Sequence, residues 1–148
     1  MPSIAESTWH GASLACAEMA RRGLIADSHL EELIDWMRKV NPPTPLLHLS
    51  SYTYFYKALF FDIRKGAHSV GSNVRDAASY VLWSLARAQS VSTLAPFAED
   101  LARTLVTVAV FDREVHIRRA ASAAFQEFVG RTVRGYMDII LLHVERTY

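Results

Sequence analysis

The sequence predicts an all-α fold in which helical hairpins stack into a solenoid of about two and a half repeats. One stripe of apolar and small residues occurs three times at the same helical spacing, in segments 9–20, 74–85 and 117–128. Helices of another pattern lie between these segments, so that two helix types alternate with a period of about 40–47 residues. That period is typical of HEAT and armadillo repeats.

We call the three segments with the shared stripe the B helices. In the second of them the stripe consists of Val74, Ala77, Ala78, Val81, Leu82 and Leu85. Each B helix has a pair of small residues one turn after its start, as at Ala120 and Ala121. Small side chains let a neighbouring helix approach closely, and a chance amphipathic helix would not carry the same pair three times. The pattern therefore favours stacked hairpins.

The intervening segments are predicted as A helices, which gives the order B-A-B-A-B. The first covers Leu30 to Met37 and is preceded by Ser28, which forms a capping-box pattern with Glu31. The second has its apolar stripe at Leu94, Phe97, Leu101, Leu105 and Val108, and Pro96 suits its first turn. An array that starts on a B helix lacks an A partner at that end, so we expect a portion of a longer solenoid.

Residues 40–57 interrupt the repeat. Without them, the first two B helices have normal spacing and Leu59 continues the stripe of Ile34. Three of the five prolines lie in this segment, so the first A helix is expected to stop near Lys39. Two interpretations stay open: a surface insertion, or a retained intron that starts at the GT of the Val40 codon. The intron is the one we rank first. We expect a HEAT-like segment over residues 7–131 and a tail of different character over residues 132–148, where Val133 could mark a second such site.

Composition excludes several function classes. The chain has 148 residues, a formal net charge of +1 and 51% hydrophobic residues, so it is a folding sequence without the charge excess of a nucleic-acid or membrane-surface binder. A single cysteine, Cys16, excludes an internal disulfide, and the histidines show no i, i+4 pair. The first residues lack the features of a signal peptide. No metal, cofactor, nucleic acid or membrane is expected.

Four charged residues recur at the same places in the repeat. Asp62 and Asp112 each follow an A helix, while Arg75 and Arg118 each lie one residue after the start of a B stripe. Carboxylates at such turns accept hydrogen bonds from free N–H groups and from guanidinium groups. The spacing predicts a structural Asp–Arg ladder between stacked repeats, in preference to a catalytic site.

The loop between the first A and second B helices is longer than its counterpart and basic. Its glycines, Gly66 and Gly71, superficially suggest a phosphate-binding loop, but Ser72 stands where the lysine is needed and no strand is expected before it. We interpret this loop as a contact for an acidic protein surface through Arg64, Lys65 and His68, or as an ordinary solvated connector.

A second positive patch is formed by arginines near the last B helix. Arg113 and Arg119 are its candidate partner-binding residues, together with Arg118 of the ladder. Nearby acidic residues argue against nucleic acid, and a solvated helix edge is the alternative interpretation.

Several long segments carry a resemblance to a known family. They are Trp9-His10-Gly11-Ala12-Ser13-Leu14-Ala15, Ala58-Leu59-Phe60-Phe61-Asp62-Ile63-Arg64-Lys65-Gly66, Ser69-Val70-Gly71-Ser72-Asn73-Val74-Arg75-Asp76-Ala77-Ala78, Phe111-Asp112-Arg113-Glu114 and Arg118-Arg119-Ala120-Ala121-Ser122-Ala123-Ala124-Phe125-Gln126-Glu127. In these segments the chain resembles tubulin-folding cofactor D, also called tubulin-specific chaperone D. The resemblance covers most of residues 7–131 outside residues 40–57, and the family's proteins are much longer helical solenoids.

This resemblance implies a chaperone scaffold that binds β-tubulin during heterodimer assembly and disassembly. It also implies companion tubulin-folding cofactors and an Arf-like small GTPase as partners, a part in stimulating GTP hydrolysis on tubulin, and a cytoplasmic, microtubule-associated location. A chain acting in this way is not itself an enzyme.

Three alternatives to this function stay open. The chain could be a generic HEAT-type adaptor with another protein partner, or a truncated fragment without autonomous function. The third is a small helical enzyme, which requires a concave pocket with converging titratable groups.

Overall fold

The computed structural model describes the backbone of residues 2–38, 58–65 and 68–145, and the side chains of residues 6–34, 58–64 and 70–132. The five main helices are α1 (Pro2–Arg21), α2 (Leu30–Arg38), α3 (Ser72–Ala88), α5 (Ala98–Phe111) and α6 (Val115–Glu145). Shorter helical turns are η1 (Asp27–His29), α4 (Val91–Leu94) and η2 (Ala95–Phe97).

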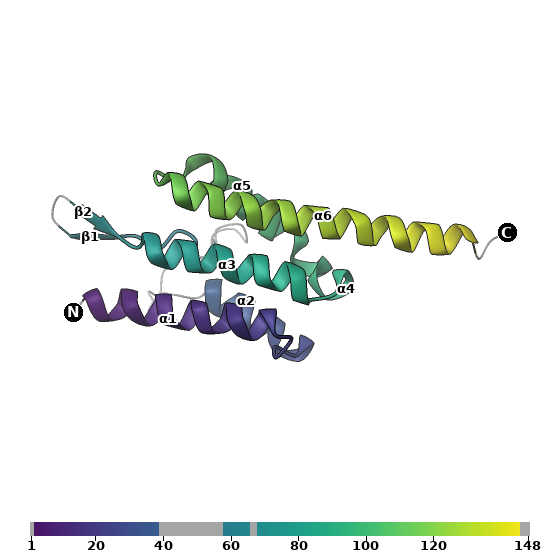
Figure 1. Ribbon diagram of the computed structural model, residues 1–148, viewed down its shortest axis with the longest axis horizontal. Helices are drawn as coiled ribbons and strands as arrows, with labels where there is room; N and C mark the ends of the chain where they lie inside the picture. Colours follow the sequence, from purple (N-terminus) through teal and green to yellow (C-terminus); the bar gives the residue numbers. More distant parts are fainter. Residues whose placement is uncertain (1, 39–57, 66–67, 146–148) are drawn as a thin grey trace, which may run out of the picture.

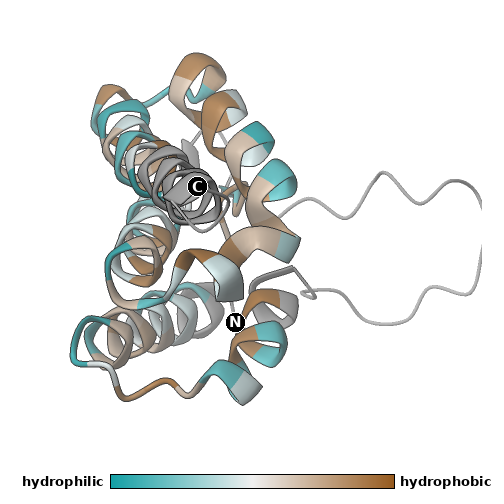
Figure 2. Cartoon of the chain, turned by 90° about the vertical axis from the view of Figure 1, so that its right-hand side faces the viewer, coloured by the Kyte–Doolittle hydropathy of each residue, from teal (hydrophilic) through white to brown (hydrophobic). Residues whose placement is uncertain are grey.

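The helices form two layers. The B helices α1, α3 and α6 lie side by side in one layer and run in the same direction (Figure 1). The A helices α2 and α5 form the second layer behind them, as the view along the helices shows (Figure 2). This arrangement is a helical solenoid of HEAT or armadillo type, and it confirms the all-α fold and the order B-A-B-A-B.

The core lies between the two layers and is built from the predicted stripes. Leu30 and Ile34 of α2, Leu85 of α3, Leu105 of α5 and Ile117 of α6 are all fully buried. Burying each such side chain stabilises the fold by roughly 1.5–3 kcal/mol. The small residues of the B stripes are buried as well, among them Ala17, Ala78 and Ala121. Their size lets the B helices pack closely.

The second A helix differs from the expected single helix over 94–108. It is divided into α4, the 3-10 turn η2 and α5, and Pro96 lies at the start of η2. Proline lacks an N–H group and its ring clashes with an α-helical turn before it, which explains why the α-helix begins only after it. At the first A helix, Ser28 lies inside η1 rather than before it, so the expected capping box is replaced by a 3-10 turn.

The segment between α2 and α3 contains a structure that we did not predict. Strands β1 (Ile63–Lys65) and β2 (His68–Val70) pair antiparallel, with Ile63 opposite Val70, and extend beyond the ends of the helices (Figure 1). The expectation that no strand precedes Ser72 was wrong, because pairing these two short segments satisfies their backbone groups. Gly71, with φ of 138°, leads from this hairpin into α3.

The two segments expected to depart from the repeat have different outcomes. Residues 40–57 lie outside the described residues, and on their far side Leu59 is fully buried in the same core cluster as Ile34. The last B helix, expected over 117–128, continues as α6 to Glu145, through most of the expected tail 132–148.

Candidate protein-binding surface

The charged residues of the predicted ladder meet where the β hairpin (β1 and β2) joins the helices. Arg75, near the start of α3, forms a two-pronged ion pair with Asp112, which follows α5: Nε lies 2.8 Å from Oδ2 and Nη2 lies 3.3 Å from Oδ1. The two side chains are only 4% and 8% exposed. A bidentate guanidinium–carboxylate pair of this kind is directional as well as strong. This ion pair joins the helical hairpin of α2 and α3 to the helical hairpin of α5 and α6.

The remaining donors of Arg75 are also used. Its Nη1 donates to the carbonyl oxygen of Phe61 at 3.0 Å and lies 3.8 Å from Oδ1 of Asp62. Because an isolated charge in a protein interior is very unfavourable, such saturation is what allows an arginine to be buried here. This residue is therefore fixed in place and is not available to a ligand.

Asp62 forms its short ion pair with another residue, Arg113. Nη2 of Arg113 lies 2.6 Å from Oδ1 of Asp62, and the side chains are 47% and 43% exposed. The neighbouring carboxylate of Asp62 raises the pKa of Arg113. Exposed pairs of this kind contribute little to stability, because solvent screens them.

Arg118, the fourth ladder residue, binds backbone rather than a carboxylate. Its Nη1 donates to the carbonyl oxygens of Asp112, at 2.7 Å, and Arg113, at 3.1 Å. Oδ1 of Asp112 in turn accepts a hydrogen bond from the backbone N–H of Glu114, next to the start of α6. Asp112 thus stabilises the start of this helix while it holds Arg75.

The predicted contact residues fall at two separate places. Arg64 is exposed on β1 of the hairpin, near the Asp62–Arg113 pair in the chain. Lys65 and His68 lie opposite each other in the hairpin register, but their side chains are outside the described residues. Arg119 is exposed on another face, along α6, so the structure does not bring it to the hairpin.

Exposed apolar side chains lie close in the chain to this charged cluster, and sequence reasoning missed them. We call Phe60, Val110, Phe111 and Val115 the turn-edge patch, and Phe111 is the most exposed of them at 79%. Phe60 and Phe111 line a cavity of about 260 Å³ together with Asp62 and Arg113. Val110 and Phe111 lie off the apolar stripe of their A helix, and this is the signal that could have found them.

A second network crosses the outer face of the B layer. The carboxylate of Glu18 in α1 accepts hydrogen bonds from Tyr80 of α3, at 2.8 Å, and from Arg21. The bond from Arg21, followed by that from Tyr80, lowers the pKa of Glu18 to about 2. Tyr80 stacks on Trp83, with ring centroids 5.9 Å apart.

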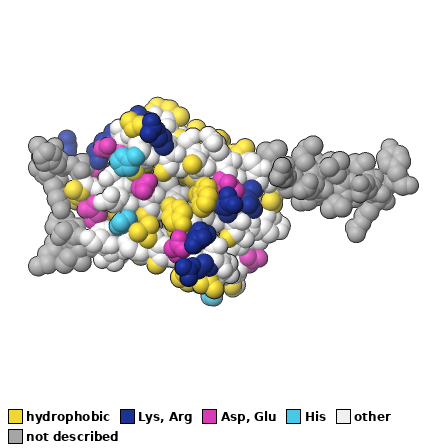
Figure 3. Space-filling view, viewed as in Figure 1, with side chains coloured by type: hydrophobic (Ala, Val, Ile, Leu, Met, Phe, Trp, Pro, Cys, Tyr) yellow, Lys and Arg dark blue, Asp and Glu magenta, His cyan; other side chains and the backbone are white. Residues whose placement is uncertain are grey.

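The same network continues from α3 to α6. The guanidinium of Arg87 lies 5.0 Å above the Trp83 ring and 3.5 Å from Glu127. On this face of the molecule, hydrophobic side chains near the middle lie next to basic and acidic ones (Figure 3). All three B helices are thus linked by polar and aromatic contacts that sequence spacing alone did not reveal.

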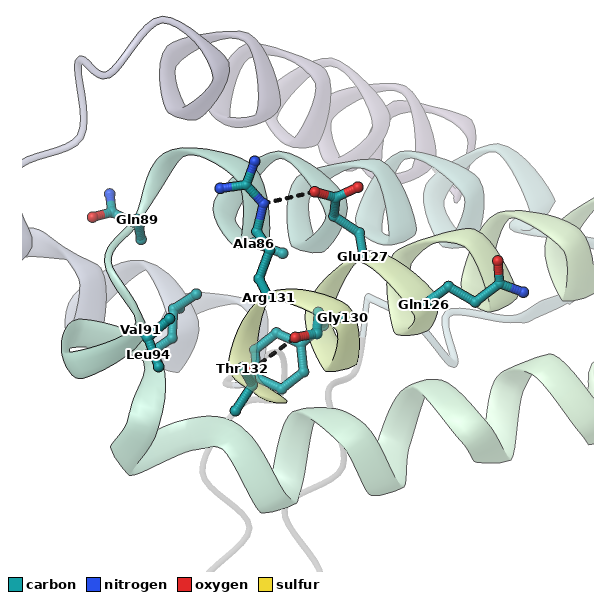
Figure 4. Close-up of a pocket in the computed structure, with 10 residues that line it drawn as sticks. Ala86, Gln89, Val91, Leu94, Gln126, Glu127, Gly130, Arg131 and Thr132 are labelled. Atoms are coloured by element: carbon teal, nitrogen blue, oxygen red, sulfur yellow. Dashed lines mark hydrogen bonds and ion pairs between the residues drawn. The ribbon is translucent and has the colours of Figure 1, made fainter. Parts of the chain in front are cut away.

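The larger cavity, of about 600 Å³, lies at the other end of the B helices, between the end of α3, α4 and α6. Its polar side chains already have partners: Arg131 pairs with Glu127 at 2.7 Å and the Thr132 hydroxyl donates to the carbonyl of Phe128 (Figure 4). Gln89 donates to the carbonyl of Ile25. Because its polar groups are committed to the protein, we assign the cavity no chemistry.

Within the described residues, no three His, Cys, Asp or Glu side chains are grouped so that they could hold a metal ion. The same part of the chain has no helix that is long and apolar enough to cross a membrane. Burial raises the pKa of the Cys16 thiol, which makes it a poor nucleophile.

Comparison with protein families decides the relationship of the chain. A model described as tubulin-specific chaperone D-like, ARM repeats, matches residues 47–137. The chain belongs to this family. The resemblance seen in the sequence is confirmed, and the match begins inside the segment 40–57.

Two curated relatives in this family are similar over most of the chain. Tubulin-specific chaperone D of Dictyostelium discoideum is 46% identical over 125 residues, which are 84% of this chain and 7% of the relative. Tubulin-folding cofactor D of Schizosaccharomyces pombe is 32% identical over 123 residues, 83% of this chain and 10% of the relative. The chain therefore spans about a tenth or less of these relatives. No solved structure matches it.

Proposed function

We propose that this segment of a tubulin-specific chaperone D-like protein is a non-enzymatic scaffold that binds β-tubulin during folding and assembly of the tubulin heterodimer. Its relatives are named for tubulin folding. The observation that carries the proposal for this chain is the turn-edge patch, where four large apolar side chains are exposed near the turns at one end of the helical stack. Exposed apolar groups that are clustered and bordered by charge are characteristic of protein interfaces.

The supporting structure beneath the patch favours binding over catalysis. Asp112 and Arg75 hold the turn in a fixed geometry, so that docking a partner orders few additional groups. Arg64 and Arg113 give the neighbourhood basic groups that fit an acidic protein surface, with Asp62 and Glu114 as local counter-charges. The titratable groups of the cluster are bound to one another, and the proposal gives none of them an acid–base role.

The proposal extends to the partners and location that the family resemblance implies. In the longer relatives such a segment would work beside other tubulin-folding cofactors and an Arf-like small GTPase, in the cytoplasm and at microtubules. Any stimulation of GTP hydrolysis on tubulin would come from holding tubulin in a suitable conformation. Arg113 is tied to Asp62 and is not proposed as an inserted catalytic arginine.

The direct test is retention of purified β-tubulin by the immobilised chain. We expect Val110→Ser with Phe111→Ser to reduce retention at least tenfold, because hot-spot apolar residues carry most of the binding free energy. Leu24→Ser is the matched control. Leu24 is also exposed, but it follows the C-terminal end of α1, at the opposite end of the B helices from the patch. Arg64→Ala with Lys65→Ala should reduce retention more at low salt than at high salt. The reason is that electrostatic attraction between protein surfaces is strongest at low salt.

Two results would overturn the proposal. Equal retention by the patch variant and the Leu24 control would remove the patch as the site, while no retention by the parent chain would favour a generic adaptor with another partner. A melting curve followed by circular dichroism distinguishes a generic adaptor from a fragment without autonomous function. A sharp transition of the monomer shows that the chain folds alone.

A further inference from the structure

The outer face of α6 repeats a surface that is covered elsewhere in the molecule. α6 follows α3 by one repeat, so Arg118, Ser122, Phe125 and Val129 correspond to Arg75, Ser79, Leu82 and Ala86. The four residues of α3 are buried, on the side where α6 packs. Their four counterparts in α6 are all half-buried.

The opposite side of the two helices provides a control for this comparison. Val74 and Ala78 of α3 are buried, and so are their counterparts Ile117 and Ala121 of α6. Both helices are therefore packed equally well toward the core. On the face that looks along the stacking direction, away from α1, the residues of α3 are buried whereas those of α6 are only half-buried.

The charged residue on that face is anchored to its own turn in both helices. Nη1 of Arg75 binds the Phe61 carbonyl of its own turn, and its Nε and Nη2 edge binds Asp112 of the next hairpin. Nη1 of Arg118 also binds carbonyls of its own turn, those of Asp112 and Arg113. Within the described part of the chain, no carboxylate pairs with the Nε and Nη2 edge of Arg118.

The shape of the face agrees with this reading. A shallow furrow of about 340 Å³ runs along it and is lined by α6 residues alone, from Val115 to Gln126, including Arg118 and Arg119. Its small side chains, Ser122 and Ala123, match the close approach that the B helices make to one another.

From this we infer that the outer face of α6 is a docking surface for a helical hairpin that presents an aspartate or glutamate at its inter-helix turn. Arg118 binds that carboxylate with its Nε and Nη2 edge, while Ser122, Phe125 and Val129 pack against the helices of the hairpin. The partner is defined by its chemistry, because the chain contains the same contact once, between Arg75 and Asp112. This surface shares Val115 with the turn-edge patch but otherwise lies along α6, and its contact does not depend on tubulin binding.

The helical hairpin formed by α5 and α6 of this chain supplies the probe. We would duplicate residues 89–131 immediately after Arg131 in the full chain, which keeps the register of the repeat and places a second copy of Asp112 opposite Arg118. The lengthened chain should gain helix content and melt at a higher temperature than the parent, because stacked repeats stabilise their neighbours.

A double-mutant cycle then tests the contact. Replacing the added Asp112 copy by Asn should lower the melting temperature by roughly 5–10 °C when Arg118 is present and have little effect after Arg118→Ala. The cycle of Arg75→Ala and Asp112→Asn in the parent chain is the positive control, and Arg118→Lys replaces Arg118→Ala if the latter does not fold. Additive effects of the two changes, or an added hairpin that stays unfolded, would overturn the inference.

Discussion

Arg75 joins the two hairpins of the molecule, because its guanidinium reaches a carboxylate of the following repeat and a carbonyl of its own. Burial of such a group is tolerated only while both contacts exist, and removing one leaves an uncompensated charge in the interior. Glu18 performs a comparable linking task on the solvent side, where it connects α1 to α3 through Tyr80. Arg75 thus links α3 to the turn after α5 in the interior, while Glu18 links α1 to α3 at the surface.

We predict that Arg75→Ala destabilises the chain by about 3–5 kcal/mol, because Asp112 then loses its buried counter-ion. Arg75→Lys should recover only part of this loss, since an ammonium group cannot make the two-pronged contact. Urea denaturation of both variants measures the free energies of unfolding. A loss for Arg75→Ala no larger than that of an exposed control, Arg103→Ala, would show that the pair does not hold the hairpins together.

A pH dependence follows from Glu18, whose pKa is lowered to about 2 in the folded chain from its ordinary value of 4.5. Between these two values the unfolded chain binds more protons than the folded chain, so stability rises with pH. The contribution is fully present above pH 4.5 and is lost as the pH falls toward 2.

Urea midpoints measured across this range should therefore fall less steeply for Glu18→Gln than for the parent chain. Tyr80→Phe removes one donor to the carboxylate and should give an intermediate slope. Identical slopes for all three proteins would contradict the assignment.

The element that departs most from the repeat is the β hairpin with the glycine that ends it. A side chain at Gly71 would place its Cβ 2.4 Å from the carbonyl oxygen of Phe61, and the φ of 138° is itself unfavourable for other residues. The carbonyl that blocks this space is the one that accepts from Arg75. The hairpin, the ladder and the start of α3 therefore depend on the same backbone position.

We predict that Gly71→Ala lowers the free energy of unfolding by more than about 2 kcal/mol, because strain and a backbone clash add together. Gly11→Ala is the matched control. Gly11 is exposed within α1 and an added Cβ meets nothing within 4 Å, so this change should stabilise the chain by roughly 0.5–1 kcal/mol. Thermal melts of both variants decide the matter, and equal effects would be inconsistent with the geometry at Gly71.

Helices with a strong periodic pattern could be predicted from the sequence, whereas contacts between them could not. The stripes of 74–85 and 117–128 place α3 and α6 correctly, because one buried face per helix fixes both its type and its orientation. The pairing partner of Arg75 depends on which turns the stacking brings together, so Asp112 rather than Asp62 is its principal partner. The turn-edge patch was missed because a search for buried stripes does not detect an exposed side chain such as that of Phe111.

On the scale of the whole molecule, each B helix packs against the B helices next to it in the stack. α3 lies between α1 and α6, whereas among the described residues α1 packs in the B layer against α3 (Figure 1). In such quasi-one-dimensional folds, local opening begins where neighbours are missing.

Hydrogen exchange followed by mass spectrometry should show this order. We expect the amides of α3 to be the most protected and those of α1 to exchange at least tenfold faster, since fraying needs less free energy than global unfolding. Protection that is uniform over the three B helices would indicate a single cooperative unit instead.

The common direction of α1, α3 and α6 also gives the molecule an electrical polarity (Figure 1). Peptide dipoles in a helix add along its axis, with the positive pole at the N-terminus. These are the three longest of the described helices, and their positive poles lie at the end that carries the hairpin, Arg64 and Arg113. We therefore expect an acidic surface to be attracted to the hairpin end of the chain at low ionic strength.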